Sequence, residues 1–556
     1  MAGGQTQLDD LLMTPDATLQ LYLREADAAL RANDTGRALR IADEAIAKGL
    51  EHPNLLTLSA HHRMHAGEDE AALTLLARAR TMSPRSVDIL NAQGICLVRL
   101  GRAREALPIF NAALRIAPGT GMLRFNKALA FEKLGELDHV RRELESVLTL
   151  MPRHHEALAW LATLATRRND GTAARDYAER ALALQPGIPA AILALATVEV
   201  ADRNFAAASA RLRPLLADPD LSPADRSMAQ SLLGDALDGE DLPHDAFTAY
   251  AAAKATMRKF YASTYEAGAF ESAANRVRRL TDYFRNADET QWRADRSEAT
   301  SGKPAMHVFL VGFPRSGTTL LEQVLASHPE IEAMEERDAL MDAVADFIRP
   351  EDGTGKLAHL PSADLQKYRE AYWKRAAEFG HGAKKTVFVD KMPLNTVLLP
   401  LVAKLFPTAK ILFALRDPRD VVLSCFRRRF GMTAQMYELT SLETAVSYYD
   451  AVMGLGEIYR DKLGLDTTDT RHEDLLADFD AETRRLCQFL GLEWREEMKN
   501  FASRARASTI DTPSGAQVAR GLTREGADQW RRYADELAPV LPKLAPWIAR
   551  FGYPEA

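Results

Sequence analysis

Small and apolar residues return at a fixed interval of 34 residues through the first half of the chain, with polar residues between them. One phase holds Ala38, Ala72, Ala106, Val140, Ala174 and Ala208, and another holds Ala45, Ala79, Ala113 and Ala181. Small residues at fixed positions let neighbouring helices approach closely. The interval therefore predicts a repeated pair of short antiparallel helices.

Turn-forming residues follow the same interval. The turn within each pair is marked by residues that tolerate a left-handed backbone, namely Gly67, Gly101, Gly135 and Asn169. The connection to the next pair begins at a proline, whose missing N–H is harmless there, namely Pro84, Pro118, Pro152 and Pro186. The unit from residue 88 to 121 carries the fullest set of signature positions. This pattern resembles the tetratricopeptide repeat, and about seven units fit between residues 17 and 260.

The resemblance implies an all-α solenoid with a concave face. We expect the array at residues 17–262, connecting helices and a linker at 263–305, and a second domain at 306–550. The polar, charged stretch 287–304 marks the junction. The period argues against an irregular helical bundle. Capture of a substrate and a scaffold or dimerisation role both remain open for the array.

A strand, a tight loop and a helix open the second half. Residues 307–312 (HVFLVG) predict a buried strand, and apolar residues at helical spacing follow the loop 313–319 (FPRSGTT). This geometry aims backbone N–H groups at a phosphate. The ATPase phosphate loop has a lysine where Thr318 stands here, whereas Arg315 lies within this loop. The pattern favours an anion cradle, and a P-loop kinase is the rival enzyme class.

A second apolar run at 410–415 (KILFAL) predicts another buried strand, which leads into 416–424 (RDPRDVVLS). This block and PRSGTT, about 100 residues apart, together resemble the sulfotransferase superfamily, above all the tyrosylprotein sulfotransferases and related bacterial enzymes fused to repeats. The resemblance covers roughly residues 306–550. It implies an α/β, P-loop-like domain with a mainly parallel sheet. It also implies 3′-phosphoadenosine 5′-phosphosulfate as co-substrate, and no metal.

The resemblance assigns the contacts to this donor. The 5′-phosphosulfate loop corresponds to Arg315, Ser316, Gly317, Thr318 and Thr319. Their amides, hydroxyls and guanidinium suit a sulfated phosphate. The 3′-phosphate contacts correspond to Arg416 and Ser424, with Arg428 as a further donor contact that shares a helix face with Ser424 if a helix begins near residue 420. The last assigned contacts are His472, where the family usually has a tyrosine, and Gln517, in the loop 514–518 that closes over the donor.

Catalytic roles also come from the resemblance. Glu336 corresponds to the general base that removes the acceptor's hydroxyl proton, and Glu335 is the neighbour most easily confused with it. Lys391 corresponds to a cation that stabilises the departing bridging oxygen, and Ser514 to a hydroxyl donor in the transition state. Other sulfotransferases use a histidine base, but His328 precedes a proline at a predicted helix end, which favours a structural role.

Three departures from the family pattern concern the donor contacts. His472 replaces the tyrosine, Gly521 stands where a proline is usual, and Gln529 stands where a cation is usual. Arg520 or Arg524 is the candidate for the missing charge. These departures keep open the hypothesis of a repeat scaffold that carries a degenerate nucleotide-binding domain.

Composition narrows the remaining classes. The net charge of −7 argues against nucleic-acid binding, and three distant cysteines indicate neither a zinc site nor a disulfide framework. The sequence has no run of apolar residues long enough for a membrane span and no signal-peptide pattern, so we expect a cytoplasmic protein. The resemblance favours a tyrosine on a peptide or protein as acceptor, held by the repeat domain. Carbohydrate, lipid headgroup and small phenolic acceptors stay open.

Overall fold

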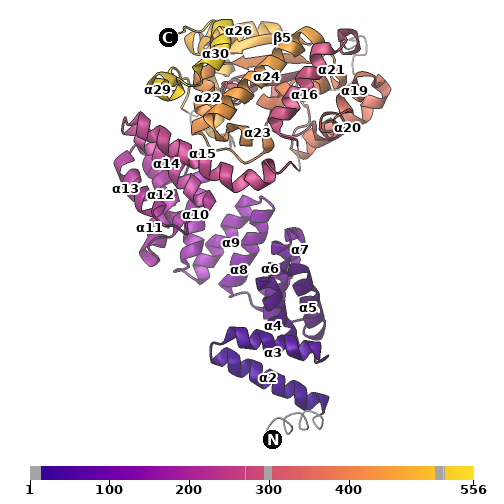
Figure 1. Cartoon of the computed structure of the whole chain (residues 1–556), viewed down its shortest axis with the longest axis vertical. Coiled ribbons are helices and arrows are strands. Elements are labelled where there is room, and N and C mark those ends of the chain that lie inside the picture. Colours follow the sequence, from indigo (N-terminus) through magenta and orange to yellow (C-terminus); the bar gives the residue numbers. More distant parts are fainter. Residues whose placement is uncertain (1–13, 269–270, 294–303, 508–517, 519, 556) are drawn as a thin grey trace. The chain divides into compact units, whose positions relative to one another are not determined.

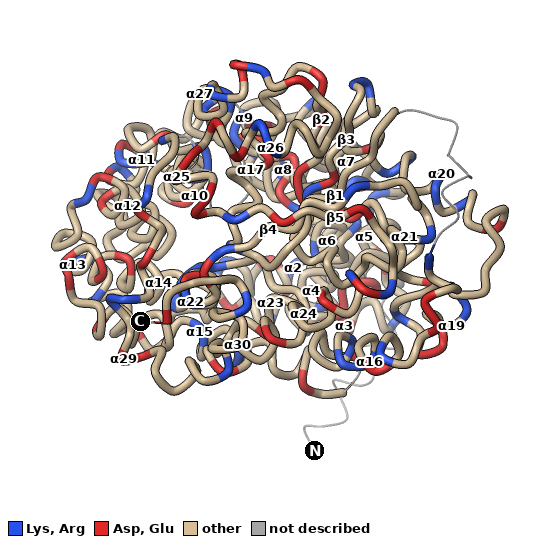
Figure 2. Tube along the Cα trace, turned by 90° about the horizontal axis from the view of Figure 1, so that it is seen from above, with Lys and Arg blue, Asp and Glu red and all other residues tan. Residues whose placement is uncertain are grey.

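The structure is a computed structural model, and it describes residues 14–268, 271–293, 304–507, 518 and 520–555 (Figure 1). The chain separates into two compact units, residues 1–198 and 199–556. Figure 2 shows that basic and acidic residues are interspersed along the chain rather than segregated by sign. Among the described helices, none combines the length and apolar character that a membrane crossing needs.

The first unit is built from consecutive antiparallel helices. They are α2 (Pro15–Arg31), α3 (Thr35–Ala47), α4 (Pro53–His65), α5 (Asp69–Met82), α6 (Val87–Arg99), α7 (Ala103–Ile116), α8 (Gly121–Lys133), α9 (Leu137–Leu150), α10 (His155–Arg167) and α11 (Gly171–Leu184). The next helix, α12 (Pro189–Ala201), contains the boundary between the units. The pairs continue as α13 (Phe205–Leu216), α14 (Pro223–Gly239) and α15 (Pro243–Tyr265), so α2 to α15 make seven pairs.

The 34-residue interval explains how these pairs pack. Every residue of the first small-residue phase, from Ala38 to Ala208, has zero exposure. The turn residues Gly67, Gly101 and Gly135 have φ between 74° and 79°, and Asn169 has φ of 55°. A Cβ on Gly94 would lie 2.5 Å from the ring of Phe110, so that helix pair requires glycine. The predicted repeat fold is confirmed.

The second unit contains α13 to α15 and a mixed α/β fold. Its strands are β1 (Met306–Gly312), β2 (Ile331–Glu335), β3 (Val387–Lys391), β4 (Lys410–Leu415) and β5 (Asp466–Arg471). Its further helices are α16 (Ala273–Asn286), α17 (Thr318–Ala326), α18 (Met341–Ala343), α19 (Gly353–Ala358), α20 (Ser362–Glu378), α21 (Leu399–Leu405), α22 (Pro418–Arg427), α23 (Ala434–Tyr437), α24 (Leu442–Leu463), α25 (His472–Ala477), α26 (Phe479–Leu490), α27 (Phe501–Ala507), α29 (Ala534–Leu537) and α30 (Leu541–Arg550).

The five strands form one parallel sheet in the order β2-β3-β1-β4-β5. The central strand β1 is buried almost throughout, as expected for a parallel strand covered on both faces. Val308 and Leu310 pack in a core with Leu321 and Val324 of α17. The predicted α/β fold with a parallel sheet is confirmed. Because ligands bind at the carboxyl ends of parallel strands, that edge is where a site is expected.

Candidate functional site

Each strand of the sheet delivers a predicted site residue to the carboxyl edge. Arg315 follows β1, Glu336 follows β2, Lys391 ends β3, Arg416 follows β4 and His472 follows β5. The register aligns the ends of three of these strands, because Glu335 of β2 and Leu310 of β1 both pair with Lys391 of β3. Residues spread over more than 150 positions of sequence therefore meet along one edge.

The loop after β1 has the backbone that an anion cradle needs. Arg315 and Gly317 have left-handed φ values of 73° and 91°, and Gly317 caps the start of α17. A Cβ on Gly312 would lie 2.6 Å from the carbonyl oxygen of Ala414, so the loop leaves β1 in close contact with β4. The hydroxyl of Thr396 accepts from the N–H of Gly312 at 3.0 Å and fixes the loop's start. The first N–H groups of α17, at Thr318 and the residues after it, have no carbonyl partner within the helix.

The two predicted donor blocks meet at this loop. Nε of Arg315 donates to Oγ of Ser424 on α22 at 2.9 Å. Nη1 of Arg416 donates to the carbonyl oxygen of Arg315 at 3.3 Å, and Nη2 donates to the carbonyl oxygen of Gly526. Arg428 is the C-cap of α22, with extended backbone, so it lies one residue beyond the helix. Its N–H still donates to the carbonyl oxygen of Ser424 at 3.1 Å, so the two residues lie one helical turn apart, and a shared face for their side chains stays a prediction.

The donor half of the site concentrates positive charge. Burial and the nearby Arg428 and Arg416 lower the pKa of Arg315 to about 10. Burial, Arg416 and Arg315 lower the pKa of His472 to about 3, so its ring is neutral at neutral pH. Nδ1 of His472 is buried and has no hydrogen-bond partner among the described residues. Such cations and an unsatisfied ring nitrogen fit an anionic, hydrogen-bonding ligand.

A small cavity of about 60 Å³ marks the donor half. It is lined by Arg315, Gly317, Leu320, Arg416, His472, Val518, Gly521, Thr523 and Gly526. The His472 ring packs so closely that a Cβ on Gly317 would lie 2.7 Å from Nδ1. Val518, Gly521, Thr523 and Gly526 of the C-terminal part border this half, and of the predicted closing loop 514–518 only Val518 is described. Ser514 and Gln517 lie outside the described residues.

A second cavity, of about 90 Å³, lies on the other side of the same loop. It is lined by Pro314, Arg315, Gly317, Thr318, Thr319, Glu336, Met392, Pro393, Leu394, Phe430 and Met436. Arg315 and Gly317 border both cavities, and the side chains of Thr318 and Thr319 are almost fully buried, as is that of Ser316. The second cavity has one carboxylate, from Glu336, and mainly apolar walls.

Lys391 forms the centre of a buried charge cluster beside this cavity. Its side chain has zero exposure, and its Nζ lies 2.8 Å from Glu336, 3.2 Å from Glu322 and 3.6 Å from Glu335. Burial alone lowers the pKa of Lys391, but the carboxylates of Glu322, Glu336 and Glu335 outweigh it and raise that pKa. Burial raises the pKa of Glu322 to about 7, against the opposing effect of Lys391.

The neighbouring glutamates Glu335 and Glu336 differ in exposure and in position. The Glu336 side chain is 39% exposed and lines the second cavity, whereas that of Glu335 is 20% exposed and does not line it. The backbone of Glu336 is left-handed, with φ of 32°, and its N–H donates to the carbonyl oxygen of Lys391 at 2.8 Å. Of the two glutamates, Glu336 is thus the one that faces the second cavity.

His328 and Arg520 do not line either of the two cavities. His328 has zero exposure, and Nε2 lies 2.9 Å from the carbonyl oxygen of Glu493, which agrees with a structural role. Arg520 is 56% exposed and lies 3.3 Å from Glu525. Sequence reasoning missed Glu322 and Thr396. An acidic residue within a helix whose Leu320, Leu321, Val324 and Leu325 are buried was the available signal for Glu322.

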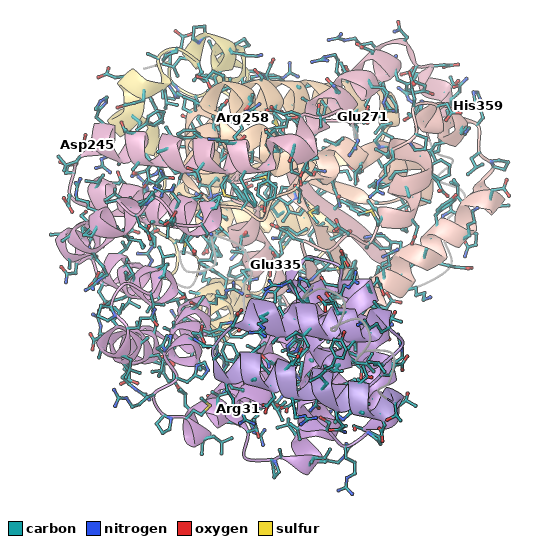
Figure 3. All side chains as sticks on the ribbon, turned by 60° about the horizontal axis from the view of Figure 1, so that its bottom comes forward. Arg31, Asp245, Arg258, Glu271, Glu335 and His359 are labelled. Atoms are coloured by element: carbon teal, nitrogen blue, oxygen red, sulfur yellow. The ribbon has the colours of Figure 1, made fainter. Side chains whose placement is uncertain are left out.

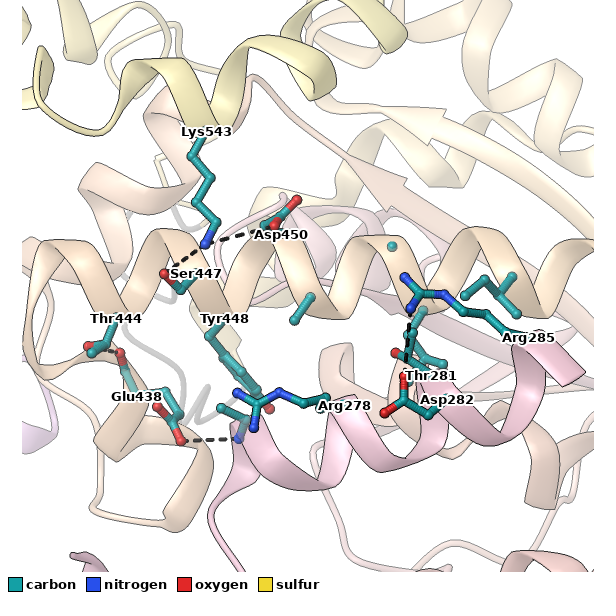
Figure 4. A pocket seen from close by; sticks show the side chains of 15 residues that line it. Arg278, Thr281, Asp282, Arg285, Glu438, Thr444, Ser447, Tyr448, Asp450 and Lys543 are labelled. Atoms are coloured by element: carbon teal, nitrogen blue, oxygen red, sulfur yellow. Dashed lines mark hydrogen bonds and ion pairs between the residues drawn. The ribbon is translucent and has the colours of Figure 1, made fainter.

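A separate hollow of about 500 Å³ lies between α16 and α24 (Figure 4). None of its lining residues is a predicted site residue. Lys543 donates to Ser447 at 3.0 Å and Arg278 donates to Asn275 at 2.9 Å, while Arg285 lies 3.6 Å from an aspartate. These cations are engaged locally, so the hollow lacks the converging charges found at the sheet edge. Among the described residues, no cluster of three or more metal-ligating side chains occurs.

Known proteins match both parts of the chain. The sulfotransferase family model matches residues 307–496, and the tetratricopeptide repeat model matches 23–87, 58–121, 91–139 and 125–189. Protein-tyrosine sulfotransferase A of Caenorhabditis elegans is 22% identical over 268 residues, which is 46% of this chain and 70% of that protein. Protein-tyrosine sulfotransferase 1 of Danio rerio is 24% identical over 258 residues, which is 44% of this chain and 72% of that protein.

An uncharacterized protein of Aquifex aeolicus strain VF5 is 26% identical over 266 residues, 45% of this chain, and the match spans only 33% of that protein's length. Among solved structures, the type IV pilus biogenesis factor PilW is 20% identical with a TM-score of 0.33, and the match covers 38% of this chain and 96% of PilW. The chain therefore joins an array of tetratricopeptide repeats to a domain of the sulfotransferase family.

Proposed function

We propose that this protein transfers a sulfuryl group from 3′-phosphoadenosine 5′-phosphosulfate to a hydroxyl group, most specifically that of a tyrosine in a peptide or protein. The hydrogen bond between Arg315 and Ser424 carries the proposal, because it joins the two donor blocks into one cradle. A nucleotide with a 5′-phosphosulfate and a 3′-phosphate offers anions at both ends of such a cradle. The relatives named protein-tyrosine sulfotransferase support the same donor.

The charge pattern of the cradle suits this donor. The loop Arg315 to Thr319 takes the phosphosulfate through backbone N–H groups, hydroxyls and a guanidinium. Arg416 and Ser424 take the 3′-phosphate, and Arg428 is a further contact to the donor. His472 offers its unsatisfied Nδ1 on the donor side of Gly317. No magnesium is needed to balance the charge where three arginines gather, which distinguishes this site from a P-loop kinase.

The chemistry follows from the second cavity. The acceptor oxygen attacks the sulfur as the bond from sulfur to the bridging phosphate oxygen breaks, and 3′-phosphoadenosine 5′-phosphate leaves. Glu336 takes the proton of the acceptor hydroxyl. Lys391 stabilises the charge that develops on the bridging oxygen, with Ser514 as a further hydroxyl donor. Glu336 and Lys391 form an ion pair of 2.8 Å, so the two groups lie side by side.

The walls of the second cavity favour an aromatic acceptor. Met392, Leu394, Phe430 and Met436 surround the space in front of Glu336 with apolar groups. A phenol ring suits such walls, whereas a sugar needs polar partners for its several hydroxyls. Tetratricopeptide arrays generally bind proteins on an extended surface, so we propose that the array holds a polypeptide acceptor. We also propose a cytoplasmic location.

Mass spectrometry after incubation with donor tests the proposal on a panel of tyrosine peptides, glycans and small phenols. We expect an addition of one sulfuryl group to tyrosine peptides. Glu336→Gln loses about 10²- to 10⁴-fold in turnover, the usual contribution of a general base. Glu335→Gln is the matched control and keeps most activity. Sulfation of glycans alone would replace the acceptor assignment, and no transfer to any acceptor would refute the function.

A further inference from the structure

We infer that α15, the last helix of the repeat array, is a working part of the catalytic site. Through Lys254 it positions the segment 424–436, which carries two of the proposed donor contacts and two residues that line the second cavity. Ser424 and Arg428 lie at the start of this segment, and Phe430 and Met436 line the second cavity. The inference rests on the proposed function, since it assigns Lys254 a role in holding the donor and acceptor contacts. Lys254 is a positioning residue and touches no substrate.

The end of α22 is held by Lys254. Its Nζ donates to the carbonyl oxygen of Arg428 at 2.8 Å and to that of Cys425 at 3.2 Å. The last carbonyl groups of a helix have no partner within it, and a cation there is favoured by the helix dipole. The same Nζ lies 5.7 Å from the ring centre of Phe430. One ammonium group thus contacts the backbone beside Ser424 and a wall of the acceptor cavity.

The ammonium group is more enclosed than the side chain as a whole. The Lys254 side chain is partly buried, but burial around its Nζ lowers the pKa of Lys254 to about 8. It therefore carries its charge at neutral pH. A hydrogen bond from a charged donor in an enclosed position is stronger than one at the surface.

Other groups of α15 hold the rest of the segment. The Tyr265 hydroxyl donates to the carbonyl oxygen of Met432 at 3.5 Å. Just after the helix, Glu266 accepts from the Tyr437 hydroxyl at 2.7 Å. Arg258, labelled in Figure 3, lies 5.0 Å from the ring centre of Tyr437. Figure 1 shows α15 running beside α22 and α23, in agreement with their contacts.

The preceding helix, α14, also holds the end of α22. Asp238 of α14 accepts from Arg427, the residue before Arg428, and from the hydroxyl of Tyr533 at 2.7 Å. It also accepts from Arg532 at 2.6 Å. The end of α22 is therefore held by two helices of the repeat array. A shift of this end moves Ser424 relative to Arg315 and Phe430 relative to Glu336.

Calorimetry with 3′-phosphoadenosine 5′-phosphate and steady-state kinetics with a tyrosine peptide test the inference on the full chain. We expect Lys254→Met to weaken nucleotide binding about 10-fold, because a charge-assisted contact to the α22 carbonyls is lost. The same variant raises KM for the peptide. Lys254→Arg restores both values to within about 3-fold, since a guanidinium can also donate to two carbonyls. Lys259→Met is the matched control, because Lys259 is exposed on the same helix.

A milder variant keeps the test decisive if Lys254→Met does not fold. Tyr437→Phe removes only the hydroxyl that donates to Glu266. It should raise KM for the peptide about 3-fold and leave nucleotide affinity unchanged, a split that a general loss of stability does not produce. If folded Lys254→Met keeps the wild-type nucleotide affinity and KM, or if Tyr437→Phe keeps the wild-type KM, the role of α15 is overturned while the proposed function stands. If the wild-type chain binds no nucleotide, both the role of α15 and the proposed function are overturned.

Discussion

Replacing Arg315 by methionine separates the effect of this arginine on the stability of the free protein from its effect on donor binding. Methionine leaves an unbranched, uncharged and shorter side chain at a position whose backbone φ is 73°, so the substitution removes the guanidinium with its charge and hydrogen bonds. In the free protein the guanidinium lies partly buried beside Arg428 and Arg416. The substitution should therefore stabilise the free protein while it abolishes tight binding of the donor.

The magnitude follows from the lowered pKa. A fall from 12.5 to about 10 corresponds to about 3 kcal/mol of unfavourable interaction with the charged form of Arg315. Solvent screening reduces this to about 1–2 kcal/mol. Loss of the hydrogen bond to Ser424 removes about 1 kcal/mol of stabilisation. The net gain at neutral pH is then about 0–1 kcal/mol, which corresponds to at most about 3 °C in melting temperature for a unit of this size.

Two assays measure the opposing effects. Thermal melting of the full chain without ligand gives the stability, and calorimetry with 3′-phosphoadenosine 5′-phosphate gives the affinity, which should fall about 100-fold. Arg285→Met is the control, because that arginine is 66% exposed on α16. It should change neither quantity by more than about 0.5 kcal/mol. A lower melting temperature for Arg315→Met together with unchanged affinity refutes the reasoning.

Three further predictions use the same geometry. Gly317→Ala puts a methyl group 2.7 Å from Nδ1 of His472 at φ of 91°, so it should destabilise the protein by about 1–3 kcal/mol in thermal melts and abolish nucleotide binding. The folded-state pKa of about 3 for His472 and His307 lies below their ordinary 6.5, so stability should fall as pH drops from 6.5 toward 3. Bound nucleotide should reduce this loss of stability at low pH, and His472→Gln should abolish that effect of the nucleotide. Equal pH dependence of the free energy of unfolding with and without nucleotide would contradict the prediction. Lys391→Met should cost about 3–5 kcal/mol because it leaves three crowded carboxylates, and adding Glu322→Gln should recover about 1–3 kcal/mol. A double variant less stable than the single one contradicts this arrangement.

Local rules predicted most of the fold from the sequence. The turn residues of the array need a left-handed backbone, and the apolar runs at 307–312 and 410–415 match β1 and β4 closely because a buried parallel strand requires uninterrupted apolar residues. The helix after β4 begins at Pro418, close to the expected position, but its early end at Arg427 leaves Arg428 outside it. A helix end depends on tertiary contacts such as the one from Lys254, which no local rule contains.

Contacts between distant segments account for what the sequence did not reveal. Glu322 lies 69 positions before Lys391, and the packing of α17 against the sheet brings their charged groups to 3.2 Å. Lys254 lies in the repeat array, 171 positions before Cys425, and nothing in the repeat pattern marks it as different from other lysines. The predicted domain limits at 262 and 305 remain predictions, while α13 to α15 fall within the second compact unit.

We propose that one cradle holds both ends of a doubly phosphorylated nucleotide. Calorimetry of the full chain with adenosine 5′-monophosphate and with its 3′-phosphorylated form measures how much the 3′-phosphate contributes to affinity. We predict that the wild-type chain binds the 3′-phosphorylated form about 100-fold more tightly, and that Arg416→Ala removes most of this difference. Equal affinities for the two nucleotides in the wild-type chain, or tighter binding of ATP with magnesium, would contradict the account.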